Sequence, residues 1–198
     1  MVTFTSKFLL RRPTRLALTG LVISLVTSAL IGITIVILGE FNETDFKILA
    51  TSATIAGVSV ALLPGFYHLE RTRYKRITLV SISTSIVFFA MILYIIWGGD
   101  VINGEWFAKL LGTFGVVAFS ANHTLLLLIP TSIKIPVIVC QRATILIIVF
   151  VVLFILTFIW TEVEPPEVMM RLFAAMCILD ALGTIVLPIL TRIFRDRP

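Results

Sequence analysis

The sequence has few charged residues, few histidines and few cysteines. Only 14% of its 198 residues are Asp, Glu, Lys or Arg, whereas 59% are hydrophobic, and soluble domains carry about a quarter of charged residues. This composition excludes an ordinary water-soluble domain. No HExxH, GxSxG or Gly-rich phosphate-binding motif occurs, and two histidines at different depths do not fit a zinc site or a bis-histidine haem. We therefore expect no cofactor, no metal and no enzymatic activity.

Long apolar runs are the dominant feature of the chain. A helix needs about 20 apolar residues to cross roughly 30 Å of hydrocarbon, and six runs of about this length occur. The alternating ten-residue strands of an outer-membrane barrel are not visible. We predict an all-α, polytopic membrane protein with a single transmembrane domain over residues 1–198. Its six predicted spans are Leu16–Leu38, Ile48–Phe66, Ile77–Trp97, Leu110–Ile129, Ala143–Trp160 and Leu172–Leu190.

Basic residues gather on one side of the predicted membrane. Thirteen of the 16 lie before the first span, after the second, after the fourth or after the sixth, while most acidic residues lie in the opposite loops. The positive-inside rule makes the thirteen cytoplasmic, which predicts cytoplasmic N and C termini and a location in the cell (inner) membrane. The net charge of +5 then reflects topology and contact with the lipid bilayer. No nucleic-acid partner is expected.

An acid followed four residues later by a base recurs along the chain. The three acids stand 62 residues apart, each at the start of an even-numbered span. This period predicts three copies of a two-helix hairpin, at about 15–70, 76–134 and 142–195. Each pair is expected to anchor its helix at the outer face, with an ion or partner site built from the three acids as the alternative. The pairs are Glu43/Lys47, Glu105/Lys109 and Glu167/Arg171.

Superposing the three hairpins aligns Ala56, Ala118 and Asp180 on the even-numbered spans. Small residues let membrane helices approach closely, so we expect these spans to pack together through this face. Asp180 then lies near the bilayer midplane, where an ionisable side chain by default indicates a function. Its carboxyl group should be neutral unless a cation or a donor faces it. The candidate polar neighbours are Asn122, Thr184 and Ser59.

Two roles remain open for Asp180. It either locks helix packing through a hydrogen bond to Asn122 or carries protons or cations across the membrane. His123 follows Ala121 by two residues, about 200° around a helix, which places it away from the Asp180 face and argues against a pair of the two. His68 is interpreted as a structural residue of an interfacial aromatic belt.

Three segments resemble a group of uncharacterised bacterial multi-span membrane proteins. They begin at Glu43 with ETDFKILATSATIAG, at Lys109 with KLLGT and at Ile178 with ILDALGTIVLPIL. The resemblance covers most of the chain and rests on apolar segments. It implies a bacterial membrane location and supplies neither an activity nor site residues.

Three classes of function are compatible with these features. We favour a non-enzymatic accessory or scaffold subunit of a membrane assembly, whose partner is another membrane protein or a second copy of the chain. A small transporter or channel, proton-coupled through Asp180, is the first alternative. A membrane enzyme or redox carrier is the second, and the lack of a nucleophile, base and metal constellation disfavours it.

Overall fold

The computed structural model describes residues 13–38, 42–71, 74–98, 104–130 and 134–194. All regular structure in these ranges is helical, as the apolar runs predict. The six helices are α2 (Pro13–Leu38), α3 (Glu43–Glu70), α4 (Lys75–Gly98), α5 (Glu105–Leu127), α6 (Ile135–Thr161) and α7 (Glu167–Ile193).

Local sequence signals explain where the helices begin. Asn42 caps α3, because its side-chain oxygen accepts a hydrogen bond from the Asp45 amide at 3.0 Å and the Asp45 carboxylate accepts one from the Asn42 amide at 3.2 Å. Pro136 lies in the first turn of α6, where the missing amide hydrogen is harmless. Pro64 and Pro188 lie inside α3 and α7.

Five of the helices, α3 to α7, are long and apolar enough to cross a membrane. In α2 the continuous stretch with described side chains, Leu18–Thr34, is too short to meet the same length requirement. By length and composition the chain is therefore a multi-pass membrane protein, and its apolar helices would contact the lipid bilayer. The count of six spans stays a prediction.

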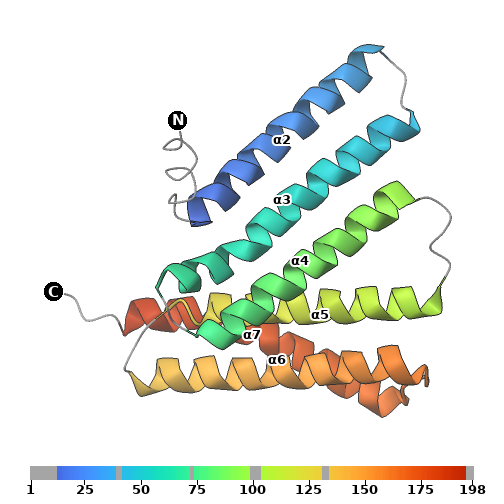
Figure 1. The fold of residues 1–198 in the computed structure, drawn as a ribbon. Helices are drawn as coiled ribbons and strands as arrows, with labels where there is room; N and C mark the ends of the chain where they lie inside the picture. The colour runs from blue at the N-terminus through green and yellow to red at the C-terminus, as the bar shows by residue number, and fades with distance from the viewer. Residues whose placement is uncertain (1–12, 39–41, 72–73, 99–103, 131–133, 195–198) are drawn as a thin grey trace.

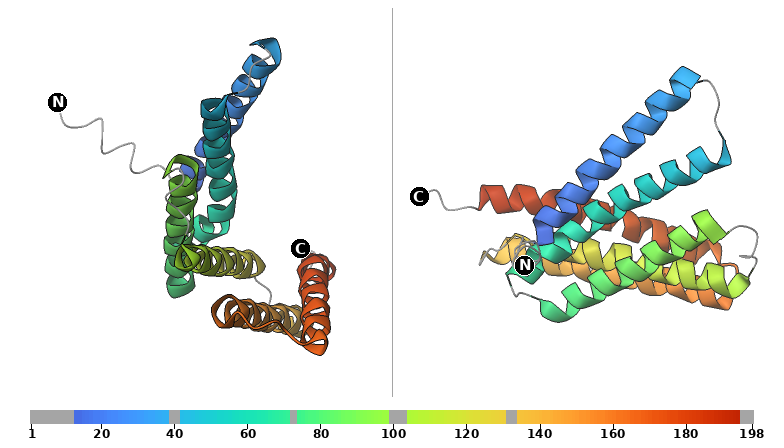
Figure 2. Two further views of the ribbon diagram at one scale, coloured as in Figure 1. Left: turned by 90° about the vertical axis from the view of Figure 1, so that its right-hand side faces the viewer. Right: turned by 45° about the horizontal axis from the view of Figure 1, so that its top comes forward.

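The helices lie side by side in the order of the chain, an open arrangement that we call the ladder (Figures 1 and 2). Each helix packs against its neighbours in the sequence, and α3 also packs against α5. The α2 helix lies at one edge of the ladder and α7 at the other. In the described residues α3 and α7 do not pack together, so the three even-numbered spans do not meet at one centre as their small residues led us to expect.

The interior of the ladder is small, and about half of its side chains are polar. Among the described residues, nine buried side chains are polar and eight are hydrophobic. Lipid tails are as apolar as leucine, so membrane helices gain little from burying aliphatic side chains and associate through close packing and hydrogen bonds instead. One apolar cluster joins α5, α6 and α7 through Leu127, Val137, Ile148 and Leu187.

Candidate functional site

Ser59 lies between the first two helices and does not contribute to a site around Asp180. A Cβ atom added to Gly20 of α2 would lie 3.4 Å from the Ser59 hydroxyl oxygen, and the Ser59 side chain is buried. In the same interface Ser52 donates a hydrogen bond to the Ser24 carbonyl at 2.6 Å and contacts the Ser28 hydroxyl at 2.6 Å. These serines hold α2 to α3.

Asn122 joins α4 to α5. Its side-chain oxygen accepts a hydrogen bond from Ser81 at 2.8 Å, and its amide nitrogen donates to Ser85 at 2.9 Å and to the Ala118 carbonyl at 2.8 Å. The amide group thus has its partners on the α4 side of α5. The predicted hydrogen bond between Asn122 and Asp180 is wrong, because these two serines bind Asn122 instead.

Asp180 faces His123 and Thr184, in the narrow region where α7 approaches α5. The Asp180 Oδ2 atom lies 3.8 Å from His123 Nδ1, within ion-pair range but beyond hydrogen-bond range. His123 Nε2 lies 2.9 Å from the Thr184 hydroxyl oxygen, and this hydroxyl donates to the Asp180 backbone carbonyl at 2.9 Å. The three side chains therefore form one connected polar cluster.

The position of His123 corrects the sequence interpretation. Consecutive residues of a helix point about 100° apart, so when Asn122 faces α4 the next side chain faces a different neighbour. The prediction assumed that α7 approaches α5 on the Ala118 face. That face is occupied by α4, since the Ala118 side chain is only 5% exposed and Asn122 binds Ser81 and Ser85. The α7 helix approaches on the His123 side instead.

Asp180 lies deep in its helix, whereas His123 lies four residues before the end of α5, and both side chains are incompletely covered. Asp180 lies thirteen residues from each end of α7. Its side chain is 20% exposed and that of His123 is 17% exposed. The second carboxyl oxygen, Oδ1, is buried and has no hydrogen-bond partner among the described residues. A buried polar atom without a partner is costly, and among the described residues Asp180 Oδ1 shares this property with His68 Nδ1.

The repeated acid–base pairs all form within their helices. The distances between charged atoms are 2.6 Å for Glu43 and Lys47, 2.7 Å for Glu105 and Lys109, and 2.6 Å for Glu167 and Arg171. Lys109 also pairs with Glu162 at the end of α6, which links α5 to α6. The spacing in the sequence gave no sign of this additional contact.

His68 is buried where α3 meets α5. Its Nε2 atom lies 2.9 Å from the Leu125 carbonyl oxygen, and its ring makes edge contacts with Tyr67 and Tyr74. The side chain is only 2% exposed. These contacts are typical of a packing residue between two helices, and the place of His68 in an interfacial aromatic belt stays a prediction.

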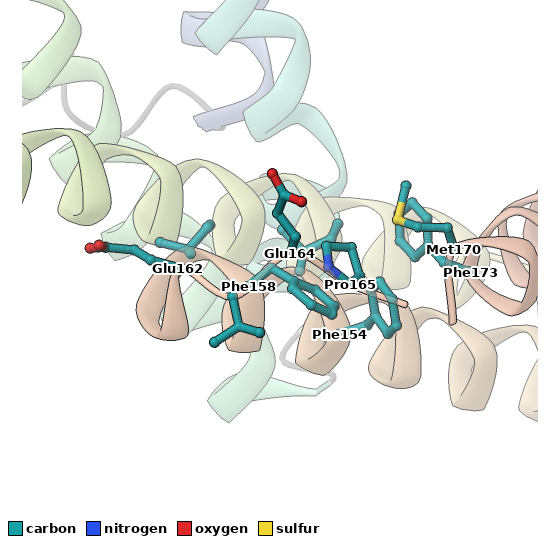
Figure 3. Close-up of a pocket in the computed structure, with 10 residues that line it drawn as sticks. Phe154, Phe158, Glu162, Glu164, Pro165, Met170 and Phe173 are labelled. Carbon is teal, nitrogen blue, oxygen red and sulfur yellow. The ribbon is translucent and has the colours of Figure 1, made fainter. Parts of the chain in front are cut away.

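An open groove of about 520 Å³ lies where α6 ends and α7 begins (Figure 3). Aromatic and aliphatic side chains line it, and Phe154 stacks on Phe173 with ring centroids 4.8 Å apart. Glu162 points away from this aromatic group. Phe173, the lining residue nearest in sequence to Asp180, precedes it by seven residues, so the groove and the polar cluster are separate features.

Two tryptophan–threonine contacts were not anticipated from the sequence. Trp97 of α4 donates a hydrogen bond to Thr51 of α3 at 3.0 Å, and Trp160 of α6 donates one to Thr113 of α5 at 3.1 Å. The two threonines are 62 residues apart, which is the period of the acid–base pairs. This spacing is the feature of the sequence from which the equivalence of the two contacts could have been predicted.

Among known proteins, no described family, no curated protein and no solved structure matches the chain.

Proposed function

We propose that the protein is a non-enzymatic accessory or scaffold subunit of a membrane assembly, with six spans in three hairpins and both termini in the cytoplasm. The observation that carries this proposal is the open edge formed by α7. This helix packs mainly against α6, yet it holds an ionisable residue halfway along its length. The surface of α7 that faces away from α6 and from His123 is therefore open to a partner helix.

The exposed surface of α7 is suited to close helix packing. Ala174, Ala175 and Ala181 are exposed on it, and small residues allow membrane helices to approach closely. Large apolar side chains beside them, such as Ile178 and Ile185, are 68% and 62% exposed. This combination supports a membrane-embedded partner, either another protein or a second copy of this chain.

The hairpin repeat is supported by the contacts between helices. The Trp97–Thr51 and Trp160–Thr113 hydrogen bonds each join the first helix of one predicted hairpin to the second helix of the preceding one. The start of α2 and the end of α7 lie at the same end of the ladder (Figure 1), which agrees with an even number of spans.

Cysteine cross-linking in native membranes tests the subunit proposal. With Cys140 and Cys177 replaced by alanine, we expect Ile178→Cys and Ile185→Cys to cross-link to one and the same species, this chain or a single other protein. Ile86→Cys on α4 is the matched control, because Ile86 is also exposed, at 53%. If α7 gives no defined product, or the control gives the same product, the proposed interface on α7 is wrong.

A second candidate, a small proton-coupled transporter, is favoured by the His123–Asp180 pair halfway along α7. Intramembrane acids and histidines commonly form proton relays. We expect proteoliposomes of the purified protein to show no proton flux above that of empty vesicles. A flux that disappears in Asp180→Asn, with the protein still folded, would replace the subunit proposal by this one.

A further inference from the structure

We propose that His123 and Asp180 together hold one exchangeable proton inside the membrane, and that Thr184 fixes the imidazole tautomer that allows this. Proton binding by the pair does not depend on whether the protein is a subunit or a transporter. It follows from the hydrogen-bonding capacity of Thr184.

The threonine hydroxyl has one hydrogen, and the geometry assigns it. Thr184 donates this hydrogen to the Asp180 carbonyl oxygen, 2.9 Å away. The same hydroxyl oxygen can then only accept from His123 Nε2, also at 2.9 Å. With the hydroxyl hydrogen on the carbonyl, Nε2 carries a hydrogen, and His123 is either the neutral Nε2–H tautomer or the doubly protonated imidazolium.

The second ring nitrogen determines how many protons the pair holds. Nδ1 of His123 faces Asp180 Oδ2 at 3.8 Å. A bare nitrogen lone pair and an ionised carboxylate would repel each other, so one proton belongs on one of the two groups. The pair is then either imidazole with carboxylic acid or imidazolium with carboxylate, and both forms have zero net charge.

The surroundings penalise any other proton count. Removing the proton leaves a lone carboxylate, and adding a second leaves a lone imidazolium, each inside the apolar part of the membrane. His123 is the only charged or titratable side chain that the described part of the structure records against Asp180. From α6, Thr144 faces Gly183 and Cys140 packs on the cluster around Leu187, while Cys177 lies three residues before Asp180 on α7.

The chain offers a direct spectroscopic test because it contains two histidines. His68→Gln removes one, leaving His123 as the only histidine for nitrogen NMR in lipid nanodiscs. Infrared spectroscopy of the same sample, compared with Asp180→Asn, reports whether Asp180 carries a proton. We expect hydrogen on Nε2 at neutral pH, and one proton on either Nδ1 or the carboxyl group.

Each combination of protonation states that these spectra can show either supports or overturns the proposal. Neutral imidazole with ionised carboxylate, or imidazolium with carboxylic acid, would overturn the proposal, as would hydrogen on Nδ1 with a bare Nε2. Where the pair is imidazole with carboxylic acid, Thr184→Val should populate the second tautomer as well, whereas Thr184→Ser should preserve the single one. Where it is imidazolium with carboxylate, Thr184→Val should raise the proportion of neutral imidazole. An unchanged nitrogen spectrum of His123 in the valine variant would exclude the role of Thr184. An intact one-proton pair without proton flux would remove only the transporter candidate.

Discussion

Replacement of Gly183 by alanine is expected to lower the free energy of unfolding by about 1 to 3 kcal/mol, because it overpacks the contact between α6 and α7. A Cβ atom at this position would overlap the Thr144 hydroxyl oxygen and lie 2.9 Å from Cγ2 and 3.0 Å from Cβ of the same residue. Thr144 has little freedom to move, since it is buried, β-branched and hydrogen-bonded to the Cys140 carbonyl. Unfolding in mixed detergent micelles measures the loss.

Two further variants identify the cause of this loss. In Gly183→Ala combined with Thr144→Ala the overlapping atoms are gone, so the double variant should recover most of the stability. Gly57→Ala on α3 is the matched control, because a Cβ atom there meets nothing within 4 Å. Equal losses in the two glycine variants would show that contact with Thr144 is not responsible.

Replacement of Asp180 by leucine should also destabilise the protein, by about 1 to 2 kcal/mol, since it leaves the Nδ1 atom of His123 without a polar partner in the membrane. Asp180→Asn keeps the shape of the side chain and one donor facing Nδ1. Its free energy of unfolding should therefore lie within about 0.5 kcal/mol of that of the unchanged protein. Thermal unfolding of both variants in one detergent measures the difference.

A double-mutant cycle tests whether the cost comes from the pair. Replacing both partners of a buried polar contact by apolar groups is much less costly than replacing one. His123→Phe combined with Asp180→Leu should therefore be more stable than the sum of the single losses predicts. Strict additivity would mean that the two side chains do not interact.

The sequence predicted the features that depend on local patterns. Apolar runs located each helix, with most ends within five residues and the start of α6 eight residues earlier than predicted, and the four-residue spacing of Glu43 and Lys47 predicted their ion pair. The depth of Asp180 also followed from counting residues along its helix. These properties require only the geometry of a single helix.

The arrangement of the helices relative to one another could not be predicted in the same way. Aligning the hairpins gave Ala118 and Asp180 equivalent positions, but equivalent faces of two helices need not meet. In the structure α4 occupies that face of α5, so Asn122 binds Ser81 and Ser85 while its neighbour His123 receives Asp180. A helix of 3.6 residues per turn presents adjacent residues to different neighbouring helices. Which helix lies against which face depends on packing across the whole ladder.

Labelling of single cysteines in intact cells with a membrane-impermeant reagent most directly tests the central claim, six spans with both ends in the cytoplasm. In a background without Cys140 and Cys177, we predict that cysteines at Thr44, Trp106 and Val168 react from outside. Cysteines at Thr14, Arg71 and Ile135 should react only after permeabilisation. Protection of Thr44→Cys, or labelling of Thr14→Cys from outside, would show that α2 does not cross the membrane as proposed and would contradict the account.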